Sequence, residues 1–362
     1  MDIVSHRRAL HRIPELDSSL PKTVAYLKNA LAGLRCRVFS PMESALCAYF
    51  DFGKPETVAF RSDADALPIL EQTGAPYAST HEGCMHACGH DGHMAILLEL
   101  ARRLDQKQTL PNNVLLVFQP AEETTGGAKR LCDTGVFAQY KVKAIFGLHL
   151  WPGLAAGEIC SRCSEMLSRS SELTVQIRGK SAHIAKAREG IDALAAGVEF
   201  YRRAIALEQA LPPHIFRLLN FGKLVSGSVR NAVSGSTRLE GSLRAFQDEV
   251  YDALRQGLMD IAADLEKTSG CTVEVTLSDG YPAVINPPAL YAQVRGIADF
   301  AELEEPSMIT EDFSWYQQSL PGMFFFLGTG DTPALHAANF DFDEAILTKG
   351  ADFFEALAEK FQ

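Results

Sequence analysis

The sequence has no apolar run of the roughly 18–20 residues that a membrane-spanning helix requires. It also lacks the cationic excess typical of nucleic-acid-binding proteins, because 45 Asp and Glu outnumber 34 Lys and Arg, for a net charge of −11. Residues 1–16 contain no apolar core of the kind a secretory signal requires. We therefore expect no membrane and no nucleic acid among the partners, and a cytoplasmic location.

Cysteine is also scarce, since eight cysteines in 362 residues are too few for a disulfide scaffold. Reduced thiols are the expected state. The single Cys-x-x-Cys, Cys160 to Cys163, stands apart from other reactive residues. Cys84 and Cys88, in contrast, lie with three histidines in "GCMHACGHDGH" (83–93). That stretch could be a metal site or hold a nucleophilic cysteine, but its Cys-x3-Cys spacing does not suit a redox pair.

Two patterns of apolar residues divide the chain. Continuous apolar runs at 113–123, 144–152 and 322–331 are typical of strands covered on both faces, and 93–104 has helical spacing. This alternation predicts an α/β domain whose mostly parallel sheet is flanked by helices. The length of the chain leaves room for a second domain.

Residues 171–279 instead alternate apolar and polar residues, as half-buried antiparallel strands do. Their predicted elements follow the order β-α-β-β-α-β, at 172–179, 190–207, 215–227, 237–246, 248–268 and 272–277. This is the ferredoxin-like order. We predict that a ferredoxin-like α+β domain (171–279) is inserted into the larger domain formed by residues 1–170 and 280–362.

Polar residues gather at the predicted strand ends, where open parallel sheets bind ligands. They are Asp63 and Asp65 after the strand at 58–61, Glu122 and Glu123 after 114–118, His149 ending 145–148, His336 after 323–327, and Cys88 and His90 in the loop before a helix at 93. Thiolate, imidazole and carboxylate groups are ligands for divalent metals. With two adjacent glutamates, one carboxylate can bind metal while the other deprotonates water, which favours metal-assisted amide hydrolysis.

Other interpretations of these residues remain open. Cys88 could be a nucleophile with a histidine base, although the paired glutamates would then have no role. Each motif alone is also compatible with a structural role. The pair "EE" could lie in a solvated turn, and His149 could be a hydrogen-bonded histidine of the core. We assign Asp91 and His93 to the helix start or to a position behind the ligands.

Nine blocks along nearly the whole chain carry a resemblance to one family. They are "RRALHRIPEL", "RSDADALPI", "MHACGHDGHMA", "FQPAEETTGGAKRL", "GLHLWPGLAAGEI", "GKSAHIAKAREGIDAL", "NAVSGSTRLEGSLRAF", "ITEDFSWYQQSLPGMFFFLGTGD" and "LHAANFD". The chain resembles the dinuclear metallo-amidohydrolases that include aminoacylases, hippurate hydrolases, auxin-conjugate hydrolases and N-acetyldiaminopimelate deacetylases. The resemblance implies an N-acyl amino acid as substrate, with a carboxypeptidase or dipeptidase, or a non-catalytic metal-binding protein, as alternatives.

The resemblance also implies roles for individual residues of the larger domain. Two divalent ions, manganese or zinc with cobalt or nickel as further possibilities, would be bound by Cys88, His90, Glu123, His149 and His336. Glu122 would be the general base, and Asp65 would orient the site from behind the ligands.

In the inserted domain, which corresponds to the family's lid, three further residues match. His183 would polarise the scissile carbonyl, and Asn231 and Arg244 would hold the substrate's carboxylate. The edge of this domain would form a homodimer. The chain departs from the family pattern at Ser181-Ala182 and at "NAVS" (231–234), which leaves the substrate preference open.

Overall fold

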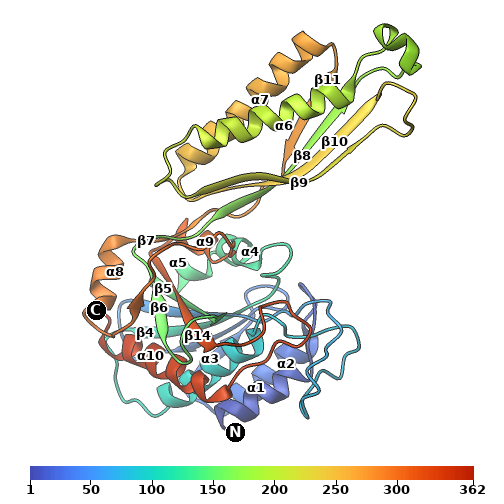
Figure 1. Ribbon diagram of the computed structural model, residues 1–362. Helices are drawn as coiled ribbons and strands as arrows, with labels where there is room; N and C mark the ends of the chain where they lie inside the picture. The colour runs from blue at the N-terminus through green and yellow to red at the C-terminus, as the bar shows by residue number, and fades with distance from the viewer. The chain divides into compact units, whose positions relative to one another are not determined.

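The strands predicted at 58–61, 114–118, 145–148 and 323–327 belong to one eight-stranded sheet in the computed structural model, which describes residues 1–362 (Figure 1). In spatial order its strands are β1 (Arg37–Phe39), β2 (Leu46–Phe50), β4 (Asn113–Gln119), β3 (Thr57–Asp63), β5 (Val142–Pro152), β14 (Gly322–Gly330), β6 (Ile159–Ser161) and β13 (Ala301–Glu302). The neighbours β4, β3, β5 and β14 run parallel, whereas β2 is antiparallel to β1 and β4, and β6 to β14. The predicted mostly parallel α/β architecture is confirmed.

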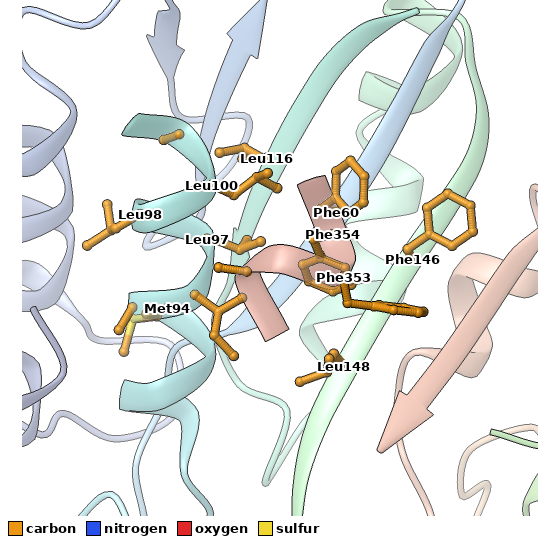
Figure 2. Packing of buried hydrophobic residues seen from close by; sticks show 14 of the residues in the cluster. Phe60, Met94, Leu97, Leu98, Leu100, Leu116, Phe146, Leu148, Phe353 and Phe354 are labelled. Carbon is orange, nitrogen blue, oxygen red and sulfur yellow. The ribbon is translucent and has the colours of Figure 1, made fainter. Parts of the chain in front are cut away.

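Helices flank this sheet. They are α1 (Ile3–His11), α2 (Pro21–Leu31), α3 (His90–Leu104), α4 (Gly127–Asp133), α5 (Val136–Gln139), α8 (Pro288–Arg295), α9 (Ser314–Gln317) and α10 (Leu347–Lys360). Helix α3 is buried along almost its whole length because it packs against the sheet, α1 and α10. Figure 2 shows Leu97 and Leu100 of α3 facing the side of α10 and the sheet, while Leu98 points the opposite way.

Two predicted boundaries next to the candidate site are wrong. Helix α3 begins at His90 instead of residue 93, because Gly89 takes a left-handed conformation (φ +84°) and its backbone turns directly into the helix. Strand β5 continues to Pro152, so His149 lies within the strand and does not end it. Strand β5 therefore ends with the apolar run at 144–152 and not at 148, and it pairs with β14 through His149, which lies opposite Phe326.

The inserted segment forms a second sheet with two helices. Its elements are β8 (Arg169–Arg178), α6 (Ala193–Gln209), β9 (Arg217–Ser226), β10 (Ser236–Ala245), α7 (Asp248–Ser269) and β11 (Thr272–Leu277), with a short 3-10 helix at Ile184–Glu189. The strands pair antiparallel in the order β11-β8-β10-β9, which is the ferredoxin-like arrangement predicted from the sequence. Apolar side chains such as Val175 and Leu239 are buried in a core with those of α6 and α7, and the alternate positions on the strands are polar.

The chain divides into two compact units. The first unit comprises residues 1–166, 285–305 and 312–362, and the second comprises 167–284 and 306–311. The predicted boundaries lay at 170/171 and 279/280, and the short segment 306–311 was not expected in the second unit. It belongs there because the Ser168 amide donates a hydrogen bond to the Ile309 carbonyl at 3.0 Å.

A two-stranded sheet of β7 (Ser164–Leu167) and β12 (Val284–Asn286) carries the points where the chain leaves and re-enters the first unit. None of the helices combines the length and apolar character that crossing a bilayer would need. All eight cysteines are free thiols.

Candidate metal centre

The carboxyl ends of β3 and β4 and the start of α3 bring the predicted ligands to one edge of the large sheet. Asp63 is the last residue of β3, and Glu122 and Glu123 follow β4. Cys88 and His90 flank Gly89, where a Cβ atom would lie only 2.8 Å from Leu150 Cδ1. A residue with a side chain would push this loop away from β5, so glycine is required to bring both ligands onto the sheet.

The Glu122–Glu123 pair is held by its own backbone. Ala121 has a positive φ of +60°, an unusual conformation for a residue with a side chain, and its carbonyl accepts a hydrogen bond from the Gly126 amide. The Asp65 carboxylate accepts hydrogen bonds from the Glu122 amide at 3.0 Å and the Glu123 amide at 3.1 Å. Asp65 therefore fixes the backbone of both glutamates without occupying their side chains.

The ligand atoms of the five predicted metal-binding residues converge. Cys88 Sγ lies 3.4 Å from His149 Nε2 and 3.3 Å from His336 Nε2. Glu123 Oε1 lies 3.3 Å from His336 Nε2 and 3.8 Å from His90 Nε2. The structure thus brings together Cys88, His90, Glu123, His149 and His336, which are up to 248 residues apart in the sequence.

The hydrogen bonds of the imidazoles distinguish ligands from supporting residues. His90 Nδ1 lies 2.8 Å from the Asp65 carbonyl and His149 Nδ1 lies 2.7 Å from the Leu150 carbonyl. A carbonyl only accepts, so each Nδ1 carries the proton and each Nε2 keeps the lone pair that binds metal. His93 differs, because its Nε2 accepts the Leu150 amide and its Nδ1 donates to Asp63 Oδ1. Neither nitrogen of His93 is available to an ion.

Two buried atoms at this place have no hydrogen-bond partner, His90 Nε2 and Glu123 Oε1. Burying such atoms unpaired is costly, and a cation between them would satisfy both. Three groups of possible ligands overlap: Cys88–Glu123–His336, His90–Glu122–Glu123, and Asp63–His90–His93–His149, the last of which would bind through members other than His93, whose nitrogens are both hydrogen-bonded. Because the first two groups share Glu123, and the second and third share His90, the residues fit neighbouring divalent ions bound by common ligands.

Burial shapes the protonation of this centre. Burial, with the nearby Glu123 and Glu122 carboxylates, raises the pKa of the Cys88 thiol well above its usual range. Near neutral pH that thiol stays protonated unless a cation shares the site, which weakens the interpretation of Cys88 as a nucleophile. Burial lowers the pKa of His149 to about 3, so its imidazole is neutral, as a metal ligand must be.

A buried charge network that was not predicted from the sequence lies under the centre. Arg61, 2% exposed, binds Asp63 Oδ2 through Nη1 at 2.9 Å and Asp312 Oδ1 through Nη2 at 2.9 Å. Its Nε donates to Gln119 Oε1 at 2.8 Å. The sequence did contain a sign of this network, since an arginine inside the apolar strand "TVAFRSD" must find carboxylate partners when it is buried.

Helix α1 is tied to the start of α3 by a second network. The Asp91 carboxylate accepts hydrogen bonds from Arg7 Nε and His11 Nδ1, both at 2.8 Å, next to the candidate ligand His90. Burial lowers the pKa of His11, but Asp91 and the hydrogen bond to Glu71 outweigh it and raise that pKa to about 9. The "RRALHR" block thus anchors the loop that carries the ligands.

The three remaining predicted site residues belong to the second unit. His183 is exposed, and its Nδ1 accepts a hydrogen bond from the Ala185 amide at 3.2 Å. The segments of His183 and Asn231 are adjacent, because the Ile184 amide donates to the Asn231 carbonyl at 2.9 Å. Arg244, half-buried near the end of β10, donates to the Met308 carbonyl. These residues therefore belong to a different unit from the predicted ligands.

Comparisons with known proteins identify a family and similar structures. Residues 59–360 match the model of peptidase family M20/M25/M40. An uncharacterized hydrolase of Staphylococcus haemolyticus is 34% identical over 370 residues, which cover 98% of this chain and 97% of that relative. A second uncharacterized hydrolase, from Staphylococcus aureus strain USA300, is 33% identical and covers 99% of this chain and 98% of its own length.

Solved structures are similar over the same range. A protein from methicillin-resistant Staphylococcus aureus superposes with a TM-score of 0.91 at 27% identity, covering 99% of this chain and 96% of that one. The Bacillus subtilis YXEP protein, described as a dinuclear metal binding peptidase of the M20 family, superposes with a TM-score of 0.85 at 28% identity, covering 98% and 96%.

Proposed function

This chain belongs to peptidase family M20/M25/M40, and we propose that this metal-dependent hydrolase releases an amino acid from its N-acyl derivative. The observation that carries the proposal is the adjacent pair Glu122 and Glu123. Glu123 Oε1 faces the imidazoles of His336 and His90, as a ligand would. Since five other residues supply enough ligands, we assign the Glu122 carboxylate to chemistry on the substrate.

Two divalent ions, manganese or zinc, with cobalt or nickel as further candidates, would be held by the five converging residues. They are Cys88, His90, Glu123, His149 and His336. When bound, such ions polarise the scissile carbonyl and lower the pKa of water. Asp65 and His93 would support the ligands: Asp65 through its bonds to the Glu122 and Glu123 amides, and His93 through Asp63 and β5.

Glu122 would act as general base and then as general acid. Its carboxylate would take a proton from the attacking water and deliver that proton to the amide nitrogen as the C–N bond breaks. Asp65 fixes the Glu122 backbone amide at 3.0 Å, so the carboxylate starts from a defined position. Little reorganisation is then needed during the reaction.

The second unit would contribute residues that bind the substrate. Since His183 Nδ1 accepts the Ala185 amide, the neutral imidazole carries its proton on Nε2, which can donate to the scissile carbonyl oxygen. Asn231 and Arg244 would bind the carboxylate of the amino acid, because a guanidinium donates to both carboxylate oxygens at once. Strand β9 is an edge strand of its sheet, which supports a homodimer formed through this unit.

The test is the variant Glu122→Gln assayed on N-acetyl and N-benzoyl amino acids after chelation and refilling with manganese or zinc. We expect kcat to fall by about 10²–10⁴-fold, because proton transfer by a placed side chain contributes that much. Metal content, measured by mass spectrometry, should stay at the wild-type value. The matched control Glu123→Gln should lose both turnover and bound metal. Near-wild-type turnover by Glu122→Gln with metal bound would remove Glu122 as the base.

A dipeptidase or carboxypeptidase is the second candidate, favoured by the description of the Bacillus subtilis relative as a peptidase. Both activities use the same chemistry at the amide and differ in what lies beyond the carbonyl. Dipeptides included in the same assay separate them. A higher kcat/KM for dipeptides than for N-acetyl amino acids would contradict the proposed deacylase activity and support the peptidase activity.

A further inference from the structure

A pocket of about 350 Å³ lies at the edge of the large sheet opposite the candidate metal centre. Three of its residues mark the amino ends of parallel strands, since Lys54 precedes β3, Asn113 begins β4 and Lys141 precedes β5. Asp63 and Glu123, in contrast, lie at the carboxyl ends of β3 and β4. Strand β3 has seven residues, which separates the two places by roughly 20 Å. We call this second place the edge pocket; its lining includes Arg37, Tyr49, Lys54, Asn113, Tyr140 and Lys141.

Buried polar groups fix the backbone around the edge pocket. The Asn113 side chain, which is buried, accepts hydrogen bonds from the Phe52 amide at 2.9 Å and the Lys54 amide at 3.1 Å, and it donates to the Lys54 carbonyl at 2.7 Å. Thr57 holds the opposite wall, because its hydroxyl donates to the Tyr140 carbonyl at 2.6 Å and its amide donates to the Lys141 carbonyl at 3.1 Å. The segments that carry both lysines therefore have defined positions without a ligand.

The edge pocket carries a surplus of positive charge. Arg37, Lys54 and Lys141 line it, no carboxylate does, and none of the three cations forms an ion pair. The carboxylate of Asp51, which interacts with Tyr49, lies nearby and offsets one charge. Three cations less one carboxylate leave a surplus of two positive charges, in a chain whose net charge is −11. Such a pocket attracts a small anion.

Aromatic rings lie beside these cations. Tyr49 is paired directly opposite Arg37 in the β1–β2 ladder, and its ring centroid lies 4.6 Å from that of Tyr140. Both tyrosines are half-buried, so part of each side chain remains accessible. The Tyr140 ring is held from behind by Phe39, on which it stacks at 5.0 Å, and its hydroxyl has no hydrogen-bond partner within the protein. The lining thus combines cations with the accessible parts of two rings.

We propose that the edge pocket binds a small phosphorylated compound that carries an aromatic ring, of the mononucleotide class. A phosphate monoester carries a charge of about −1.5 to −2 near neutral pH, which matches the surplus, whereas one carboxylate would not. The Arg37 guanidinium can donate to two phosphate oxygens at once, and Lys54 and Lys141 add charge. The ring of the ligand would lie against Tyr49 and Tyr140, as bases do on aromatic side chains. The volume is within the range of small-molecule sites.

The experiment measures binding of adenosine 5′-monophosphate, adenosine and inorganic phosphate to the metal-loaded protein by calorimetry at low salt. We expect the monophosphate to bind more tightly than phosphate or adenosine alone. Arg37→Gln should raise its dissociation constant by about tenfold or more, because hydrogen bonds to charged groups contribute that much. The matched control is Lys143→Gln, since Lys143 lies near the same edge but already pairs with Glu56 at 3.2 Å. This control should keep the wild-type dissociation constant within about twofold.

A second variant tests the aromatic part of the site. Tyr49→Leu keeps an apolar side chain but removes the ring, so it should weaken the monophosphate about tenfold and leave inorganic phosphate unchanged. No binding of the monophosphate to wild type would overturn the proposal. So would a dissociation constant that survives Arg37→Gln, which is the result expected if the phosphate bound at the metal centre instead. Equal affinities for phosphate and the monophosphate would overturn the mononucleotide class. None of these measurements depends on the hydrolytic activity proposed above.

Discussion

The proposed functional residues of the first unit are buried and hydrogen-bonded, whereas those of the second unit lie at or near its surface. His90 and Asp65 are fully buried, and each has its position fixed by backbone groups from other segments. His183 and Asn231 are exposed, and the Arg244 guanidinium donates to a backbone carbonyl, that of Met308. The first unit is therefore preorganised by its own fold, while the second needs a ligand to complete its contacts.

This difference follows from the chemistry that each unit would perform. Metal ligands must be held closely and without competing protons, which demands burial and a fixed partner for the second imidazole nitrogen. Residues that recognise a substrate must stay accessible and keep unpaired hydrogen-bonding groups until it arrives. Changes in the first unit should thus affect stability and metal binding, and changes in the second should affect substrate selection alone.

The largest expected effect is on stability, from Arg61→Met. This change leaves the buried Asp63 and Asp312 carboxylates without their shared cation and should destabilise the first unit by roughly 3–5 kcal/mol. Trp151 and Trp315 both lie in the first unit, so tryptophan fluorescence during urea denaturation reports on it alone. Arg238→Met, on the exposed sheet face of the second unit, should cost less than about 1 kcal/mol. Equal losses of stability in the two variants would contradict the difference between the two units.

A pH-dependent effect comes next, from His11 in the network at Asp91. Its pKa is raised from 6.5 to about 9, so protonation stabilises the folded state, fully below pH 6.5 and progressively less as pH rises through 9. His11→Gln should therefore destabilise the first unit by on the order of 3 kcal/mol at pH 6 and by clearly less at pH 9.5. A constant difference across this range would contradict the pairing of a charged His11 with Asp91.

The smallest expected effect is confined to substrate binding, from Arg244→Lys. The variant keeps the charge but loses the two-pronged geometry, so KM for an N-acyl amino acid should rise about tenfold while metal content and stability stay unchanged. Arg238→Lys, a matched change on the same face of β10, should leave KM within about twofold. If Arg244→Lys lowered metal content instead, the separation of roles between the two units would be wrong.

Local sequence patterns were sufficient to predict the helices and strands, but not where each begins or which distant residues it contacts. The apolar run at 113–123 corresponds to β4, and the alternation at 172–179 corresponds to β8. Both were predictable because a strand buried on two faces has consecutive apolar residues and a strand buried on one face alternates apolar and polar residues. The start of α3 at His90 was missed because it depends on the left-handed Gly89 packed against Leu150. The Arg61 network was missed because Asp312 lies 251 residues away in the chain.

The sequence by itself determined which donor groups are present and in what order: a thiol and imidazoles before a helix, paired carboxylates after a strand, and a distant His336. Only the tertiary structure decided what each imidazole can do. His90 and His93 are three residues apart on one helix, yet the Asp65 carbonyl leaves His90 Nε2 open while the Leu150 amide occupies His93 Nε2. The Asp65 carbonyl lies in the loop after β3 and the Leu150 amide lies in β5, and no local pattern around α3 encodes either partner.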